Sequence, residues 1–120
     1  MPGLRLVVDG ANIVGSRPDG WWRDRAGAAR RLYERLVEMA GDGEIVLVLE
    51  GQARAGVAEG DGSVQVVHAP HDGDGAIVEL VAGLARPEEW TVVTADRDLR
   101  RRVEALGAAV AGPSAVLDRP

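Results

Sequence analysis

The chain begins its first structured segment with Leu4-Arg5-Leu6-Val7-Val8-Asp9-Gly10-Ala11-Asn12, an aliphatic run that ends on an aspartate and a small turn. A continuous run of this kind is typical of a strand buried on both faces of a parallel sheet. Similar runs recur along the chain, separated by segments with helical spacing of apolar residues. The further strands expected are Glu44–Leu49, Ser63–His68 (at an edge), Trp90–Thr94 and Ala108–Ala111, and the helices are Trp22–Ala40, Asp74–Leu84 and Asp96–Leu106.

Strands and helices that mostly alternate predict a three-layer α/β/α architecture with a mainly parallel central sheet of about five strands. The segment from Asp9 to Gly20 is rich in glycine and is expected to be a loop, as is Gly51 to Gly62. The length of 120 residues suits one domain that spans residues 1–120.

Composition excludes several kinds of chemistry. The chain has no cysteine, so disulfides and thiolate metal sites are excluded, and its 14 basic residues are all arginine, which excludes a catalytic lysine. The net charge of −5 argues against a passive nucleic-acid coat protein but not against a nuclease. No run approaches the ~20 apolar residues of a membrane span. Because no signal-peptide pattern precedes the first strand, a cytoplasmic location is expected.

Acidic residues follow the predicted strands. Since the carboxyl ends of parallel strands share one edge of a sheet, these carboxylates are expected to converge there. Like charges so close together require shifted pKa values or a bound cation, and oxygen ligands suit hard divalent cations, Mg²⁺ in particular. The alternative for each aspartate is a helix cap or a turn. The candidate metal ligands are Asp9, Glu50, Asp74 and Asp96, and the candidate catalytic residues are Asp9, Asp74, Asp96 and Asp98.

Other residues are candidates for holding the site together or for contacting substrate. Asn12 can hold the first turn or touch a phosphate, and Thr94 can steady a carboxylate. Glu50 is expected to pair with Arg54. The expected substrate contacts are Asn12, Arg17, Arg23, Thr94 and Arg97.

Two tryptophans precede the long helix. Trp21 and Trp22, with the arginines beside them, can form a wall for phosphates and a stacked base. The alternative, which helical spacing favours for Trp22, is that this side chain belongs to the core.

Four motifs occur in an order that resembles the NYN domain family, in particular its YacP-like branch within the PIN-like nuclease superfamily. They are Val7-Val8-Asp9-Gly10-Ala11-Asn12, Val48-Leu49-Glu50-Gly51, Asp74-Gly75-Ala76-Ile77-Val78-Glu79-Leu80 and Val93-Thr94-Ala95-Asp96-Arg97-Asp98-Leu99.

The resemblance implies a compact α/β domain with a Mg²⁺- or Mn²⁺-dependent ribonuclease site. By position, Asp9, Asp74 and Asp96 match the family's metal-binding aspartates, and Asp98 matches a further acidic site. Glu50 stands where relatives often carry aspartate, and Gly73 stands where some relatives have a second acid.

The main expectation is therefore a metal-dependent endoribonuclease whose partner is single-stranded RNA. The alternatives are a metal-dependent phosphohydrolase of small nucleotides and a non-catalytic module that binds RNA or a protein. A phosphoacceptor domain is disfavoured because the chain has no lysine. A homodimer is a further expectation, with Ala115, Val116 and Leu117 packing on a second copy.

Overall fold

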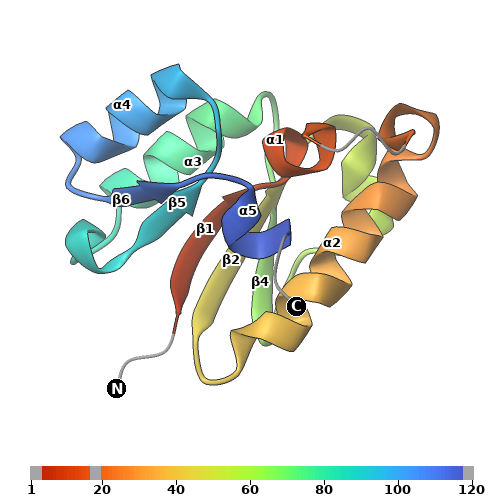
Figure 1. The fold of residues 1–120 in the computed structure, drawn as a ribbon, viewed down its shortest axis with the longest axis horizontal. Helices are drawn as coiled ribbons and strands as arrows, with labels where there is room; N and C mark the ends of the chain where they lie inside the picture. Colours follow the sequence, from red (N-terminus) through yellow and green to blue (C-terminus); the bar gives the residue numbers. More distant parts are fainter. Residues whose placement is uncertain (1–3, 17–19, 118–120) are drawn as a thin grey trace.

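A computed structural model of the protein describes residues 4–16 and 20–117. Its centre is a six-stranded sheet with the order β3-β4-β2-β1-β5-β6, in which all neighbouring pairs are parallel except β3 with β4 (Figure 1). The strands are β1 (Arg5–Asp9), β2 (Glu44–Leu49), β3 (Gly60–Asp61), β4 (Val64–His68), β5 (Thr91–Val93) and β6 (Ala109–Ala111).

Helices connect the strands on both faces of the sheet. The α-helices are α1 (Gly10–Gly15), α2 (Arg25–Ala40), α3 (Gly73–Ala82), α4 (Arg97–Ala105) and α5 (Ser114–Leu117), and three short 3₁₀ helices are η1 (Trp21–Arg23), η2 (Gly51–Gly56) and η3 (Pro87–Glu89). The mainly parallel α/β architecture expected from the sequence is therefore confirmed, with one strand more than expected.

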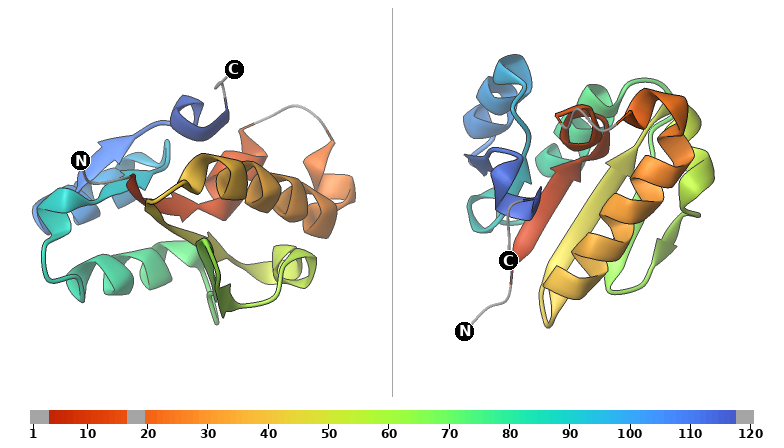
Figure 2. Two further views of the ribbon diagram at one scale, coloured as in Figure 1. Left: turned by 90° about the horizontal axis from the view of Figure 1, so that it is seen from below. Right: turned by 45° about the vertical axis from the view of Figure 1, so that its right-hand side comes forward.

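Alternate residues of each strand face opposite layers, as the period of two requires. On one face, Leu6 and Val8 pack with Ile13 of α1, Leu36 of α2 and Val116 of α5. On the other face, the core is made with α3 and α4, and its residues include Val7, Val46, Val92, Ile77 and Leu99 (Figure 2).

The direction of winding reverses at β1. From β1 the chain moves through α2 to β2 and β4, and it then returns through α3 to β5 on the other side of β1. Open α/β sheets bind ligands outside the carboxyl ends of the strands at such a reversal. The end of β1 is therefore the place at which a site is expected.

Several local expectations from the sequence are wrong, among them the loop expected from Gly51 to Gly62, which contains η2 and β3. Residues 10–15 form α1 rather than a loop, because Asp9 caps the helix by accepting a hydrogen bond from the Asn12 N–H at 3.4 Å. A Cβ at Gly10 would lie 2.6 Å from the Val48 carbonyl oxygen, so glycine lets α1 lie directly against β2.

The helix expected from Trp22 begins later. Asp24 caps α2 by accepting from the Gly27 N–H at 2.9 Å, and Trp22 lies in η1 before that cap. Trp22 is 53% exposed, so its expected place in the core is also wrong.

The edge expected at Ser63–His68 is covered. The two-residue strand β3 pairs antiparallel with β4, with Gly60 opposite Val66 and Asp61 opposite Gln65. Because β3 is short and exposed, it leaves little strand edge for pairing with another chain.

The short helix α5 packs on the chain's own core. Val116 is fully buried, and Ala115 and Leu117 are partly buried against the same cluster. The expectation that these residues face a second copy is therefore wrong for Val116, and a homodimer stays a prediction without that surface. Within residues 4–16 and 20–117, no helix is long and apolar enough to cross a membrane.

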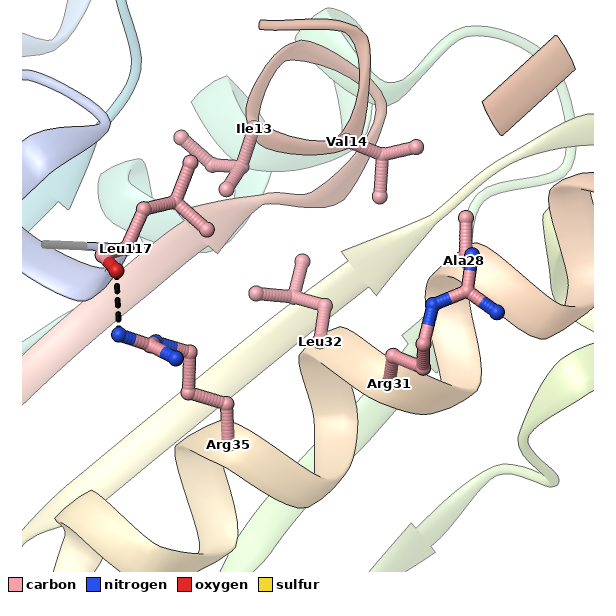
Figure 3. A pocket seen from close by; sticks show the side chains of 7 residues that line it. All are labelled: Ile13, Val14, Ala28, Arg31, Leu32, Arg35 and Leu117. Atoms are coloured by element: carbon pink, nitrogen blue, oxygen red, sulfur yellow. Dashed lines mark hydrogen bonds between the residues drawn. The ribbon is translucent and has the colours of Figure 1, made fainter. Parts of the chain in front are cut away.

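A cavity of about 320 Å³ lies between α1, α2 and α5. At one end of the cavity, Arg35 of α2 donates to the carbonyl oxygen of Leu117 (Figure 3). Its Nε also donates to the carbonyl oxygen of Val116 at 2.5 Å. These bonds satisfy carbonyls that a helix as short as α5 cannot pair internally. The lining residues are Ile13, Val14, Ala28, Arg31, Leu32, Arg35 and Leu117.

We expect Arg35→Met to lower the free energy of unfolding by about 2 kcal/mol, because charge-assisted hydrogen bonds to two backbone carbonyls of α5 are lost while the apolar stem is kept. Urea denaturation measures this change. The matched control is Arg31→Met one turn earlier on α2, where a change below about 0.5 kcal/mol is expected. Equal losses in the two variants would contradict the role assigned to Arg35.

Candidate active site

The candidate site is built at the end of β1 on the face covered by α3 and α4. Asp9 has the same strand parity as Val7, and Glu50 has the same parity as Val48, and both valines belong to that face. Helices α3 and α4 also begin at this end of the sheet (Figure 1). Parity and topology together direct the carboxylates of two adjacent strands toward the first turns of two helices.

Asp9 is the buried centre of the group. It is 3% exposed, and its Oδ2 accepts a hydrogen bond of 2.9 Å from the hydroxyl of Thr94, which is fully buried. Burial raises the pKa of Asp9, and the hydrogen bonds from Thr94 and from the Asn12 N–H oppose that rise. The charges of Glu50 and Asp96 raise the pKa further, so both groups lie close enough to repel Asp9.

Asp74 lies in the first turn of α3 and is partly buried. Its pKa is raised to about 6, mainly by desolvation and further by the charges of Asp96, Asp9 and Asp72. A hydrogen bond between the Asp74 and Asp96 carboxyl groups raises it as well, because such a contact requires a proton on one of them. The cap of α3 is Asp72, whose Oδ1 accepts from the Gly75 N–H at 2.6 Å, so the capping role considered for Asp74 belongs to Asp72.

Asp96 has two roles at once. Its Oδ1 accepts from the N–H groups of Asp98 and Leu99 at 2.9 and 3.1 Å and so caps α4. Its carboxyl also contacts Asp74 and acts on Asp9. The cap holds one oxygen in place and therefore fixes the direction in which the group meets its neighbours.

Glu50 closes the other side of the group. A Cβ placed on Gly73 would lie 3.1 Å from the Glu50 Oε1 and 3.9 Å from the Asp9 Oδ1. Gly73 therefore keeps open a space beside two carboxylates. The pairing expected between Glu50 and Arg54 is absent from the described residues, where the Arg54 Nε instead donates to the Gly51 carbonyl at 3.1 Å.

Asn12 and Thr94 hold the frame of the site. The Asn12 Oδ1 accepts from the Ala95 N–H at 2.8 Å, which ties α1 to the loop between β5 and α4. Thr94 donates to Asp9 and accepts from the Asp96 N–H at 3.1 Å. Because Thr94 is fully buried, it positions the two aspartates, and the substrate contact expected for it is wrong.

Asp98 lies apart from this group. Its carboxylate is paired with Arg101 at 2.9 Å and with Arg102 at 3.9 Å on the exposed surface of α4. It is not among the groups that shift the pKa of Asp9 or Asp74. Its geometry is that of a charge in the first turn of a helix, which the helix dipole favours, and gives no support to the catalytic role expected for it.

The expected substrate arginines have different positions. Arg97 is exposed at the start of α4, close in sequence to the site. Arg23 is exposed in η1, where its guanidinium lies 5.8 Å from the centroid of the Trp22 ring. Arg17 lies outside the described residues.

The chemistry of this donor set suits a hard divalent cation, because carboxylate oxygens that repel one another are stabilised by one. The positions of these carboxylates, however, do not form a complete metal-binding site. Within the part of the chain that the structure describes, no three or more His, Asp or Glu side chains are grouped so as to hold a metal ion. We use the name acidic cluster for four neighbouring carboxylates, those of Asp9, Glu50, Asp74 and Asp96. Their side chains would have to rotate toward a common point to bind one ion.

Comparisons with known proteins agree with the fold. The chain matches no known family model and no curated protein by sequence. Among solved structures, a crystal structure of a mutant Rae1 (YacP) from Bacillus subtilis has a TM-score of 0.75 and 20% identity, and the match covers 96% of this chain and 73% of that one. A second structure of Rae1 (YacP) from Bacillus subtilis gives 0.69 and 19%, and covers 95% and 71%.

A likeness at this identity establishes a shared fold. YacP is also the branch of the NYN family that the four sequence motifs resemble. The fold inferred from those motifs is therefore confirmed, and the site chemistry that the family implies has to be argued from the residues of this chain.

The acidic cluster predicts a pH-dependent stability in metal-free protein. The pKa of Asp74 is raised from 3.8 to about 6, so its proton contributes stability that is full below pH 3.8 and is lost as the pH rises through about 6. We expect Asp74→Asn to raise the melting temperature at neutral pH, because an uncharged amide can still donate to Asp96. The difference from the wild type should vanish below pH 3.8.

Thermal unfolding in a chelator at several pH values measures this effect. The control is Glu104→Gln, which removes an exposed charge from α4 without touching the acidic cluster. A variant Asp74→Asn that is no more stable than Glu104→Gln at neutral pH would show that the carboxylates do not repel as described.

Proposed function

We propose that the protein is a Mg²⁺- or Mn²⁺-dependent endoribonuclease that hydrolyses single-stranded RNA at the acidic cluster. The observation that carries the proposal is the convergence of Asp9, Glu50, Asp74 and Asp96 at the reversal of the sheet, with raised pKa values at Asp9 and Asp74. The resemblance to NYN domains and the fold shared with Rae1 (YacP) support the same class of activity. A cytoplasmic location fits this proposal.

The role proposed for each carboxylate follows from how exposed its side chain is. Asp9 is buried and is held by Thr94, so it suits a fixed ligand. Asp96 and Glu50 would hold the cation from either side, and the space beside Gly73 leaves room between Glu50 and Asp9. Asp74 is partly exposed, so water reaches it more easily than Asp9, and it would accept the proton of the attacking water.

When bound, Mg²⁺ or Mn²⁺ would polarise the scissile phosphate and lower the pKa of a coordinated water. The chain's own contribution is to gather the carboxylates, to fix two of them through Thr94 and the cap of α4, and to tie α1 to the loop between β5 and α4 through Asn12. Arg97, exposed beside the cap of α4, would contact the RNA backbone.

We expect the wild type to cleave a labelled single-stranded RNA in the presence of Mn²⁺. Asp96→Asn and Asp9→Asn should each lose about 100-fold or more of the rate, because each aspartate would hold the cation that activates the attacking water. Gel analysis of the products measures this loss. Glu104→Gln should retain the wild-type rate. Cleavage by Asp9→Asn at the wild-type rate, with contaminating nucleases excluded, would overturn the assignment.

Asp98→Asn is an informative neighbour of Asp96→Asn, because both change an aspartate around the start of α4. If the pairing with Arg101 is its role, the variant should cleave at nearly the wild-type rate. A loss as large as that of Asp96→Asn would return Asp98 to the site.

The same assay separates the remaining alternatives. Release of phosphate from mononucleotides without cleavage of RNA would favour a nucleotide phosphohydrolase. RNA binding without either activity would favour a non-catalytic module. Melting curves with and without Mn²⁺ provide a readout other than activity, since a cation held by the acidic cluster should raise the melting temperature of the wild type more than that of Asp9→Asn.

A further inference from the structure

An exposed aromatic group with cationic neighbours lies next to α1. The Trp21 and Trp22 rings meet edge to face, with centroids 6.2 Å apart and an interplanar angle of 89°. The guanidinium of Arg23 lies 5.8 Å from the Trp22 centroid, and that of Arg25 lies 5.4 Å from the Trp21 centroid. These four residues are here called the tryptophan platform.

The platform exposes an indole to solvent. Trp22 is 53% exposed, the largest exposed fraction among the exposed large apolar side chains of the described residues. Trp21 is only partly exposed and packs on α1, where a Cβ at Gly15 would lie 3.6 Å from the Trp21 Cζ2. Trp21 therefore supports Trp22, which is left available for a ligand.

Helix α1 lies between the acidic cluster and the tryptophan platform. Asp9 is the N-cap of α1, and α1 has six residues, which corresponds to about 9 Å of axial rise. Ala11 and Gly15 are four residues apart, and hence on one face of α1, and both are exposed. An RNA strand lying along that face would pass the small side chain of Ala11 before it reaches Trp21, which packs on Gly15.

We propose that the tryptophan platform is a subsite that stacks an unpaired base of single-stranded RNA on Trp22, while Arg23 and Arg25 contact adjacent phosphates. Every base has a π face, so such a contact selects single strands without reading sequence. The local positive charge complements a phosphate backbone on a chain whose net charge is −5. The subsite rests on the proposed ribonuclease function, and it supplies the selection of unpaired RNA that the acidic cluster lacks.

The test is the affinity for a fluorescently labelled single-stranded RNA in a chelator, where binding is measured without cleavage. We expect Trp22→Ala to raise the dissociation constant about 5- to 150-fold, the range that loss of one base–aromatic stack gives. Trp22→Tyr should stay close to the wild type because it keeps a π face, whereas Trp22→Leu should resemble Trp22→Ala because it keeps only apolar bulk. Leu106→Ala, which removes an exposed apolar side chain directly after α4, is the control and should not change the affinity.

The charges are tested in the same assay. Arg23→Ala and Arg25→Ala should each weaken binding and reduce the salt dependence of the affinity by about one ion. A fully paired RNA of the same length should show no effect of Trp22→Ala, because its bases are stacked inside the duplex. Unfolding midpoints of all variants check that each is folded.

Three results would overturn the proposal: no binding of single-stranded RNA by the wild type, an unchanged affinity in Trp22→Ala, or equal losses in Trp22→Tyr and Trp22→Leu. If the affinity of Trp22→Ala is unchanged, the exposed indole would instead be a candidate contact for a protein partner. Binding that depends on Trp22 without cleavage under any metal would keep the platform and overturn the ribonuclease. Cleavage of RNA whose binding does not depend on Trp22 would support the ribonuclease and overturn the platform.

Discussion

A carboxylate buried at the end of the central strand is the constraint on which the rest of this structure depends. Asp9 is 3% exposed and is paired with a neutral hydroxyl rather than with a cation. Such a group is costly to keep charged, and the carboxylates around it increase the cost. This costly group lies at the end of β1, where the direction of winding of the sheet reverses. Destabilised groups of this kind are characteristic of functional sites.

The neighbouring elements are arranged around that group. Thr94 joins Asp9 to the backbone of Asp96, and Asn12 joins α1 to the same loop. Asp96 serves as the cap of α4 and as a member of the acidic cluster, so one side chain both starts a helix and sets the direction of a candidate ligand. Such shared roles explain how a short chain can hold several carboxylates in place with few additional residues.

The surface outside the acidic cluster is asymmetric. On the α4 side, Asp98 and Arg101 form an exposed ion pair. On the α2 side, η1 presents the exposed Trp22, with Arg23 beside it and Arg25 beside Trp21. Under the proposed function the two surfaces would have complementary effects. The acidic cluster would repel phosphates in the absence of a cation, and the tryptophan platform would hold RNA before the reacting bond reaches the carboxylates.

Much of this could be read from the sequence. Aliphatic runs with strand length define β1, β2 and β5, and parallel pairing follows from the helices between them, so the convergence of acids after strands was predictable from local pattern. Three features depended on tertiary structure. The packing of Gly10 places α1 directly against β2, and the winding of the chain places α3 and α4 on the face of the sheet that Asp9 and Glu50 share. The cap at Asp24 is a local feature that the sequence can indicate. The exposure of Trp22 is not a local feature, because helical periodicity cannot tell whether a turn before a cap lies against the core or in solvent.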